Sequence, residues 1–317
     1  MELNKYRLLR FLNQFTNIHK EGNKKNIFIF STPRSGSTWL NNLFATQKGI
    51  KYCNEPLNLR NDKIRSISKI NSWDELYDKD LKQKLIPYFK DFCSGKIKWF
   101  NPHPIRKNYH LFTERIVFKI INGAEYFIND IKNECNGKVI YLLRHPIPVS
   151  LSRNKLPRLE VLTSQKVIDN FPVSMQKMTK SIIEKGDFMD KAVLSWCIQN
   201  KIALDQDHND WLIICYEQLV IDPLPIINEI KKEFELDNTK KFIEQLDIPS
   251  KVTIQSSEGT KELITNKSNN SNDFIERWRS KVSKQKEKEL FDIVDCFGLS
   301  DIYNVGSTYP TERYLIK

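Results

Sequence analysis

Four short apolar runs, each rich in β-branched or aromatic residues, predict strands that are buried on both faces. These runs are Ile27–Ser31, Ile116–Ile120, Val139–Leu143 and Leu212–Tyr216. Segments with helical periodicity lie between and after them: Thr38–Gln47, Glu75–Cys93, Ala124–Glu134, Asp190–Asp207, Pro223–Phe234, Lys240–Leu246 and Lys284–Phe297. This alternation predicts an α/β fold in which helices flank a central parallel sheet. Ligands of such sheets bind at the carboxyl ends of the strands.

One of these strands leads into a turn that is suited to hold an anion. Ile27–Ser31 is followed by a tight turn from Ser31 to Gly36, and a helix begins at Ser37 and Thr38. A strand that breaks into such a turn and then opens a helix directs several backbone N–H groups and the helix dipole at one point. The turn therefore predicts a binding site for an anion, usually a phosphate.

The same turn lacks the residues of a nucleotide-triphosphatase loop. Such a loop reads GxxxxGK followed by Ser or Thr, whereas here Gly36 is followed by Ser37 and no lysine lies there to reach β- and γ-phosphates. No acidic residue follows a strand where a magnesium ligand is expected. Both departures argue against ATP hydrolysis.

Composition narrows the class of protein. A chain of 317 residues with 40% hydrophobic and 11% aromatic residues is expected to be globular. It has no run of about 18 apolar residues, so we expect no membrane span. The net charge of +11 comes from scattered lysines and arginines rather than one basic stripe with aromatics. We therefore expect no nucleic-acid partner, and a basic surface also suits a small polyanionic ligand.

Six cysteines are spread singly along the chain, without CxxC or Cys/His ligand spacing: Cys53, Cys93, Cys135, Cys197, Cys215 and Cys296. This pattern argues against structural zinc. The amino-terminal segment is too charged for a secretory signal. Together these features favour a reduced, cytoplasmic protein.

The residues of the anion-binding turn resemble a loop of one enzyme family. The sequence TPRSGSTWL, which begins at Thr32, is similar to the 5′-phosphosulfate loop of sulfotransferases that use PAPS (3′-phosphoadenosine 5′-phosphosulfate). The resemblance implies that Arg34 takes a position where many members have a catalytic lysine; because arginine does not readily donate a proton, its role is electrostatic. It also implies that the loop's backbone holds the phosphosulfate, and that Trp39 stacks on adenine or packs under the helix. The loop residues concerned are Ser35, Gly36, Ser37, Thr38 and Trp39.

A second motif lies where this family requires one. The strand Val139–Leu143 runs into Arg144-His145-Pro146, and Ser152 follows Arg144 by eight positions. The family's 3′-phosphate motif has the same strand, Arg-x-Pro and serine spacing. Pro146 can open a helix, and a guanidinium offers a fork of donors to a phosphate dianion. The resemblance therefore implies that Arg144 and Ser152 bind the 3′-phosphate.

Two later segments resemble further elements of the family. The first is Tyr216-Glu217-Gln218-Leu219, which implies that Tyr216 lines the adenine pocket or packs in the core, and that Glu217 supports the fold. The second is Arg277-Trp278-Arg279, which follows a polar loop that supplies 3′-phosphate contacts in the family. The candidates for these contacts are Lys267, Ser271 and Arg277, and Trp278 is expected to anchor the core.

The family uses either a histidine or a glutamate as the base that deprotonates the acceptor. The strand Ile116–Ile120 contains Lys119 but no histidine, whereas Cys53-Asn54-Glu55-Pro56 resembles the family's glutamate element. The resemblance implies that Glu55 is the base and that Lys119 assists the leaving phosphate. Alternative bases are His103, His110 and His145, of which His145 is expected near the 3′-phosphate.

The resemblance spans roughly residues 26 to 297 and implies a P-loop-like sulfotransferase domain over residues 1–317. Its reaction would move the sulfuryl group of PAPS in line to an acceptor hydroxyl or amine, releasing PAP without a metal. We expect a helix within residues 1–25, a lid or acceptor-facing insertion at 156–189, and a polar loop at 255–273. The expected acceptor is a small molecule or carbohydrate, with the Glu55 element favouring carbohydrate. A PAP-binding protein without activity, a nucleotide kinase and a nucleic-acid-binding protein are the alternatives, and oligomeric state stays open.

Overall fold

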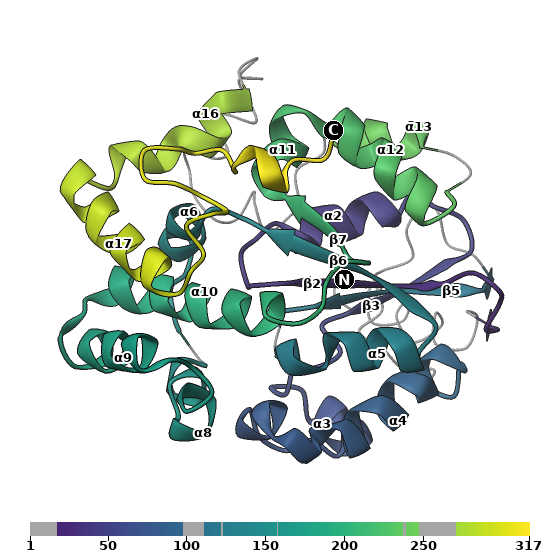
Figure 1. Ribbon diagram of the computed structural model, residues 1–317. Coiled ribbons are helices and arrows are strands. Elements are labelled where there is room, and N and C mark those ends of the chain that lie inside the picture. The colour runs from purple at the N-terminus through teal and green to yellow at the C-terminus, as the bar shows by residue number, and fades with distance from the viewer. Residues whose placement is uncertain (1–17, 98–110, 122, 157, 237–238, 247–270) are drawn as a thin grey trace, which may run out of the picture.

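A computed structural model describes residues 18–97, 111–121, 123–156, 158–236, 239–246 and 271–317. Its centre is a parallel sheet of five strands (Figure 1), in the order β3-β5-β2-β6-β7. The strands are β2 (Asn26–Ser31), β3 (Ile50–Asn54), β5 (Arg115–Ile120), β6 (Gly137–Leu143) and β7 (Leu212–Cys215). A separate small sheet pairs β1 (Ile18–His19) with β4 (Phe112–Thr113). The predicted α/β class with a parallel sheet is therefore confirmed.

Helices cover both faces of the central sheet, and they bury the side chains of its middle strands. Every residue of β2 and β5 is buried. Ile27 and Ile29 of β2 pack against α2 (Ser37–Phe44), α11 (Tyr216–Ile221), α12 (Pro223–Glu233) and α13 (Lys240–Leu246). Phe28 and Phe30 alternate with them and pack against α4 (Lys82–Cys93), α5 (Ile128–Glu134) and α10 (Phe188–Leu204).

The carboxyl ends of the strands face a second group of helices, on the left in Figure 1. This group includes α6 (Pro146–Leu151), α10, α16 (Ser271–Glu276), the 3₁₀ turn η4 (Arg277–Ser280) and α17 (Lys284–Cys296). Helix α10 packs against both α6 and α17. In the part of the chain that the structure describes, the other helices are α3 (Asp62–Ser68), α7 (Leu159–Leu162), α8 (Gln165–Ile168) and α9 (Val173–Lys185), with 3₁₀ turns η1 (Asp74–Tyr77), η2 (Lys79–Leu81), η3 (Glu125–Phe127) and η5 (Glu312–Tyr314). Within the described residues, no helix combines the length and apolar character needed to cross a bilayer.

Several predicted boundaries need correction. The edge strand β3 was not predicted, and Tyr216 begins α11 instead of ending β7. The predicted helix 75–93 is broken into η1, η2 and α4. Residues 271–273 of the predicted polar loop belong to α16, and residues 18–19 of the predicted amino-terminal helix form β1. The rest of those two predictions lies outside the described residues, at 1–17 and 255–270, apart from residues 20–25, which are described and form no helix.

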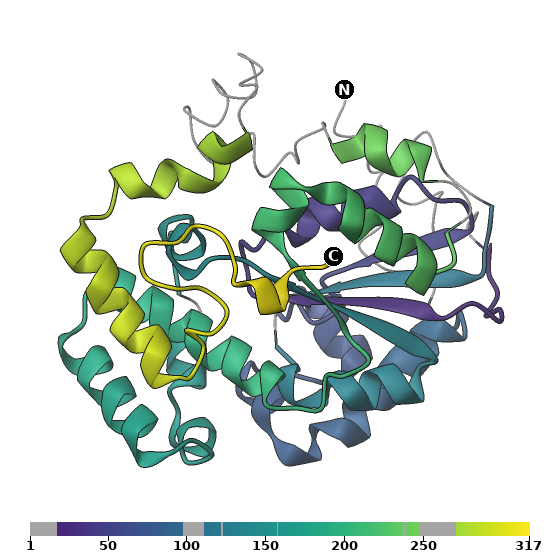
Figure 2. The same ribbon diagram turned by 45° about the horizontal axis from the view of Figure 1, so that its top comes forward.

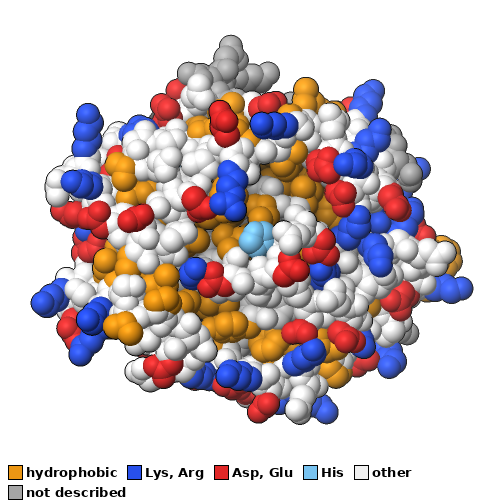
Figure 3. Space-filling model, viewed as in Figure 1, with side chains coloured by type: hydrophobic (Ala, Val, Ile, Leu, Met, Phe, Trp, Pro, Cys, Tyr) orange, Lys and Arg blue, Asp and Glu red, His pale blue; other side chains and the backbone are white. Residues whose placement is uncertain are grey.

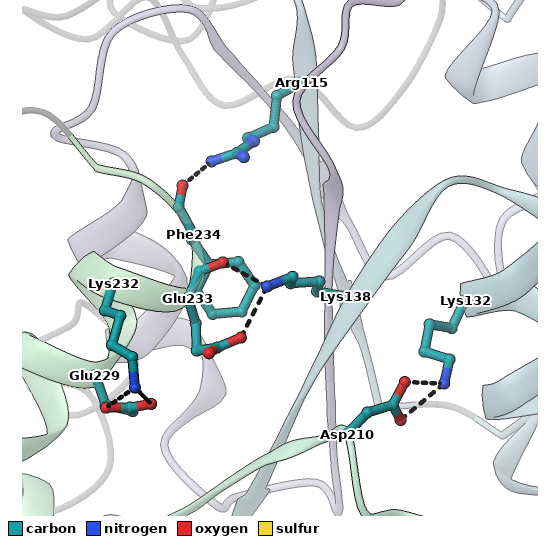
Figure 4. Close-up of polar contacts among 8 residues, drawn as sticks. All are labelled: Arg115, Lys132, Lys138, Asp210, Glu229, Lys232, Glu233 and Phe234. Atoms are coloured by element: carbon teal, nitrogen blue, oxygen red, sulfur yellow. Dashed lines mark hydrogen bonds and ion pairs between the residues drawn. The ribbon is translucent and has the colours of Figure 1, made fainter.

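Polar contacts hold α12 to the amino ends of the sheet strands (Figure 4). Ligands of parallel sheets bind at the opposite, carboxyl ends. Lys138, near the start of β6, donates to the backbone oxygen of Glu233 at 2.9 Å and to its carboxylate at 2.8 Å. Arg115, at the start of β5, donates to the backbone oxygen of Phe234. These contacts fix the helix at one end of the strands and leave the other end for the site.

A buried carboxylate joins the carboxyl-terminal segment to the sheet. Glu217 is 1% exposed. It accepts the His145 backbone N–H at 2.9 Å and the Tyr303 hydroxyl at 2.7 Å. The segment that carries Tyr303 passes around α6 and ends beside the sheet (Figure 2). Glu217 is therefore placed as a structural anchor, as expected.

Replacing Tyr303 with phenylalanine tests this anchor. The variant leaves one buried oxygen of Glu217 without its hydroxyl donor, so we expect the free energy of unfolding to fall by about 1–3 kcal/mol in urea titrations. The control is Tyr314→Phe, because the Tyr314 hydroxyl lies 3.4 Å from Asp301 at an exposed position. This control should change stability by less than about 0.5 kcal/mol. Equal effects of the two variants would show that the Glu217 contact does not stabilise the fold.

Candidate functional site

The turn between β2 and α2 has the backbone conformation of an anion-binding loop. Arg34 and Gly36 both have positive φ angles, of 78° and 92°. The Thr32 and Ser35 hydroxyls lie 2.7 Å apart and fasten the turn internally. Helix α2 starts directly after Gly36, and its first turn contains no acidic residue. The N–H groups that begin a helix lack intrahelical acceptors, so this end of α2 can hold an anion.

Gly36 is required here by a close approach as well as by its φ angle. A Cβ atom at this position would lie 2.5 Å from Cδ2 of the Tyr216 ring. The Tyr216 ring also meets the Trp39 ring edge to face, with centroids 5.8 Å apart. The two aromatic side chains predicted to serve the adenine base are thus brought together beside the loop.

Arg144 joins the second predicted motif to the first. It follows β6, and its Nη1 donates to the backbone oxygen of Arg34 at 3.0 Å. Its guanidinium lies 4.1 Å from the centre of the Tyr216 ring. Among the described residues, its buried Nε has no hydrogen-bond partner. A donor left open in this position suits an anionic ligand.

Arg34 reaches the serine of the second motif. Its Nε donates to the Ser152 hydroxyl at 3.4 Å, at the carboxyl end of α6. Burial, and then the nearby Arg144 cation, lower the pKa of Arg34. Two cations held this close together favour binding of an anion between them.

The predicted base, Glu55, and Lys119 form an ion pair at the carboxyl ends of β3 and β5. Lys119 is the last residue of β5 that pairs with β3, opposite Asn54, so that Glu55 follows directly beside it. The Lys119 side chain is 4% exposed, and its ammonium lies 3.0 Å from Oε1 of Glu55. It also donates to the Thr38 hydroxyl at 2.9 Å. The loop and the carboxylate are therefore linked through one buried cation.

Glu55 is held in place by its own turn. Its φ angle is 57°, and its backbone N–H donates to the Lys119 oxygen at 2.8 Å. The Asn58 side chain donates to Oε2 at 3.2 Å. Sequence reasoning missed Asn58, although its spacing of three from Glu55 in a turn was a usable signal.

The late candidates are only partly placed. Ser271 begins α16, which packs beside α11, and Arg277 lies in the turn that follows it. Trp278 is 3% exposed and stacks on His145 with ring centroids 4.9 Å apart, which agrees with a core anchor. Lys267, His103 and His110 lie outside the described residues.

His145 is engaged in structural contacts rather than open to a substrate. It is 1% exposed. Its Nδ1 accepts the Ile147 N–H at 3.3 Å, which leaves Nε2 to donate to the Ser307 oxygen at 3.1 Å. Burial lowers its pKa to about 3. In this setting His145 is a neutral core residue, so Glu55 is the better placed of the described candidate bases.

Comparison with solved structures finds several sulfotransferases. The sulfotransferase domain of the Synechococcus PCC 7002 olefin synthase has a TM-score of 0.43 and 17% identity, over 89% of this chain and 97% of that domain. Mouse SULT7A1, solved with PAP, has a TM-score of 0.43 and 14% identity, over 93% and 90% of the chains. STF1 from Mycobacterium tuberculosis H37Rv has a TM-score of 0.39 and 12% identity, over 82% of each.

No protein-family model matches the sequence, and no curated protein matches it. Since the TM-scores of the solved structures lie below 0.5, the function has to be argued from the site's own residues. The described residues contain no group of three or more His, Cys, Asp or Glu side chains that could hold a metal ion.

Two alanine variants separate the steric role of Gly36 from its φ angle. Gly36→Ala adds a Cβ that collides with Tyr216 and forces φ = 92° on an alanine. We expect it to lower the free energy of unfolding by about 2–4 kcal/mol, from strain and overpacking together. Gly306→Ala has a similar φ of 81° but meets nothing within 4 Å, so it should cost only about 1–2 kcal/mol. Equal losses in thermal or urea unfolding would contradict the close contact with Tyr216.

Proposed function

We propose that this protein is a PAPS-dependent sulfotransferase. The observation that carries the proposal is the contact of Arg144 with the backbone of Arg34, which joins two anion-binding motifs into one site. A site for a single anion needs only the loop, whereas PAPS presents a 3′-phosphate and a 5′-phosphosulfate. The Lys119–Glu55 pair beside the loop adds the groups that transfer to an acceptor requires.

In this proposal each end of PAPS has its own residues. The loop from Arg34 to Trp39 takes the 5′-phosphosulfate at the start of α2. Arg144 and Ser152 take the 3′-phosphate through charge-assisted hydrogen bonds. Ser271 and Arg277 add further contacts to the 3′-phosphate. Trp39 and Tyr216 bind the adenine. The bound co-substrate supplies the activated sulfuryl group, so the protein's work is to orient it and stabilise its charge.

The transfer step needs one base and several cations. The acceptor oxygen forms a bond to sulfur while the bond from sulfur to the 5′-phosphate oxygen breaks, and the electron pair of that bond leaves on PAP. The acceptor's proton moves to the carboxylate of Glu55. Arg34 and Lys119 stabilise the negative charge that develops on the departing phosphate oxygen.

The surface next to Glu55 favours a hydroxyl-rich acceptor. An open, shallow surface there is formed by five polar residues, which are Asn58, Arg60, Asn61, Asp62 and Lys63. Asn58 connects it to the base, since its amide donates to Glu55. Pockets for apolar small molecules are lined mainly by hydrophobic side chains, so this lining supports a carbohydrate rather than a lipid.

The competing classes have less support. A nucleotide kinase needs a lysine after the loop glycine, and this chain has Ser37 there. A nucleic-acid-binding protein needs a continuous basic surface, whereas acidic and basic side chains are interspersed over the face in Figure 3. A PAP-binding protein without activity differs from the proposed enzyme in lacking turnover, which the first experiment below measures.

Glu55→Gln tests the base. The amide keeps the size of the side chain but cannot accept the acceptor's proton, so transfer of label from PAPS to a mixed acceptor panel should be abolished. PAP affinity should stay within about twofold. Glu233→Gln, at the opposite edge of the sheet, is the matched control and should retain turnover. Normal turnover by Glu55→Gln would show that another group is the base.

Arg144→Ala tests the second anion site. Loss of charged hydrogen bonds should weaken PAP binding by about 2 kcal/mol or more, which is roughly thirtyfold, in calorimetric titrations. The control is Lys138→Ala, which removes a cation from the other end of the same strand and should leave PAP affinity unchanged. Unchanged affinity in Arg144→Ala would overturn the 3′-phosphate assignment.

A further inference from the structure

Arg153 is a buried cation whose donors are mostly unused. It follows Ser152 directly and is 8% exposed. Its Nη1 donates to the Ala192 oxygen of α10 at 3.3 Å, which is a long contact. Its Nε and Nη2 are shielded from solvent and have no hydrogen-bond partner among the described residues. Buried polar groups are nearly always hydrogen-bonded, so two open donors on one guanidinium require an explanation.

The charges around Arg153 make its position less favourable still. Burial, and then the cations of Arg158 and Arg34, lower its pKa to about 9, so it remains charged at neutral pH. No carboxylate of the described chain forms an ion pair with it. A buried charge without a counter-ion destabilises a fold, and removal of such a group often stabilises it.

Arg158 provides a direct contrast five positions later. It is also buried, at 6% exposed. Its Nη1 lies 3.6 Å from the Glu125 carboxylate, and its Nη2 donates to the Ile121 oxygen at 3.0 Å. One buried arginine is therefore compensated within the described chain, and its neighbour is not.

From this contrast we infer that Arg153 binds an anionic group, a carboxylate or a sulfate, that the acceptor itself carries. The inference rests on the proposed function and specifies its substrate class as acidic acceptors. Such an anion would supply the acceptor atoms that Nε and Nη2 lack and would neutralise the charge that Arg153 shares with Arg34. The cost of keeping Arg153 buried is then offset when the substrate binds.

The position of Arg153 assigns the anion to the acceptor rather than to the co-substrate. Arg144 and Ser152 already serve the 3′-phosphate, and the loop with Arg34 serves the phosphosulfate. Arg153 instead contacts α10 and neighbours Arg158. Arg158 in turn is bonded to the backbone of Ile121, two residues beyond Lys119. Arg153 is thus near Arg34 of the loop and near Arg158, which is bonded to the segment that follows β5, the strand that presents Lys119 to Glu55.

A stability comparison separates a ligand-binding role from a structural one. Arg153→Met keeps an unbranched, flexible stem and removes the uncompensated charge, so the Tm of the ligand-free protein should rise by about 2 °C. Arg158→Met is the matched control, and because it removes the cation that faces the buried Glu125 carboxylate, its Tm should fall by about 5 °C or more. A fall in the Tm of Arg153→Met as large as that of Arg158→Met would overturn the inference.

A binding experiment tests the ligand directly. The wild-type protein saturated with PAP is titrated with sodium sulfate, sodium glucuronate or glucose, at ionic strength held constant with sodium chloride. We expect sulfate or glucuronate to bind and glucose to bind at least tenfold more weakly. Arg153→Met should lose at least tenfold in affinity for the anion while its PAP affinity is unchanged, and the anion that binds better identifies carboxylate or sulfate as the source.

Other results of the titration are equally decisive. The inference is overturned if neither anion binds to the wild-type complex, or if Arg153→Met binds them as tightly as wild type. Failure of the wild-type protein to bind PAP is a different result, since it contradicts the proposed function before the anion is added. The two proposals therefore fail in distinguishable ways.

Discussion

The Lys119 ammonium is the contact on which the arrangement of the site depends. A buried cation must find acceptors within the fold, and Lys119 finds one on the loop helix and one on the turn after β3. Those two acceptors, Thr38 and Glu55, come from segments on opposite sides of β5 in the sheet. The ammonium therefore sets the distance between the anion-binding loop and the Glu55 carboxylate. If either moved, the buried cation would lose a hydrogen-bond acceptor.

The rest of the site is organised in the same way, by charges that meet at the carboxyl edge of the sheet. Arg144 donates a hydrogen bond to the loop backbone, and Arg34 of the loop donates to Ser152, so the two motifs stabilise each other. Glu217 is a buried acidic side chain on this side, and it serves the fold through Tyr303 and the His145 backbone. Arg34 and Arg144 therefore remain beside the loop to bind the anionic groups of the proposed co-substrate.

Much of this arrangement follows from the sequence, because the local signal is strong where a strand is a continuous apolar run. The four predicted runs match β2, β5, β6 and the edge strand β7 within two residues at each end, and both anion motifs lie where strands end. The edge strand β3 was missed because Lys51 and Asn54 interrupt its apolar pattern and only two of its residues are buried. Its register with β5, which brings Glu55 to Lys119, is a tertiary contact that no local pattern contains. Arg153 was overlooked for a related reason, since an arginine in sequence is expected to be exposed.

The contact between Gly36 and Tyr216 makes two positions that are far apart in the chain into one steric unit. The ring occupies the volume in which a side chain at position 36 would begin, so position 36 cannot gain a side chain unless the residue at 216 becomes smaller. Among homologous sequences, the two should therefore vary together: a residue other than glycine at 36 would need a small one at 216. Such paired variation would show that the contact between the anion-binding loop and Tyr216 is inherited as a unit. It could also identify relatives whose other motifs are no longer detectable.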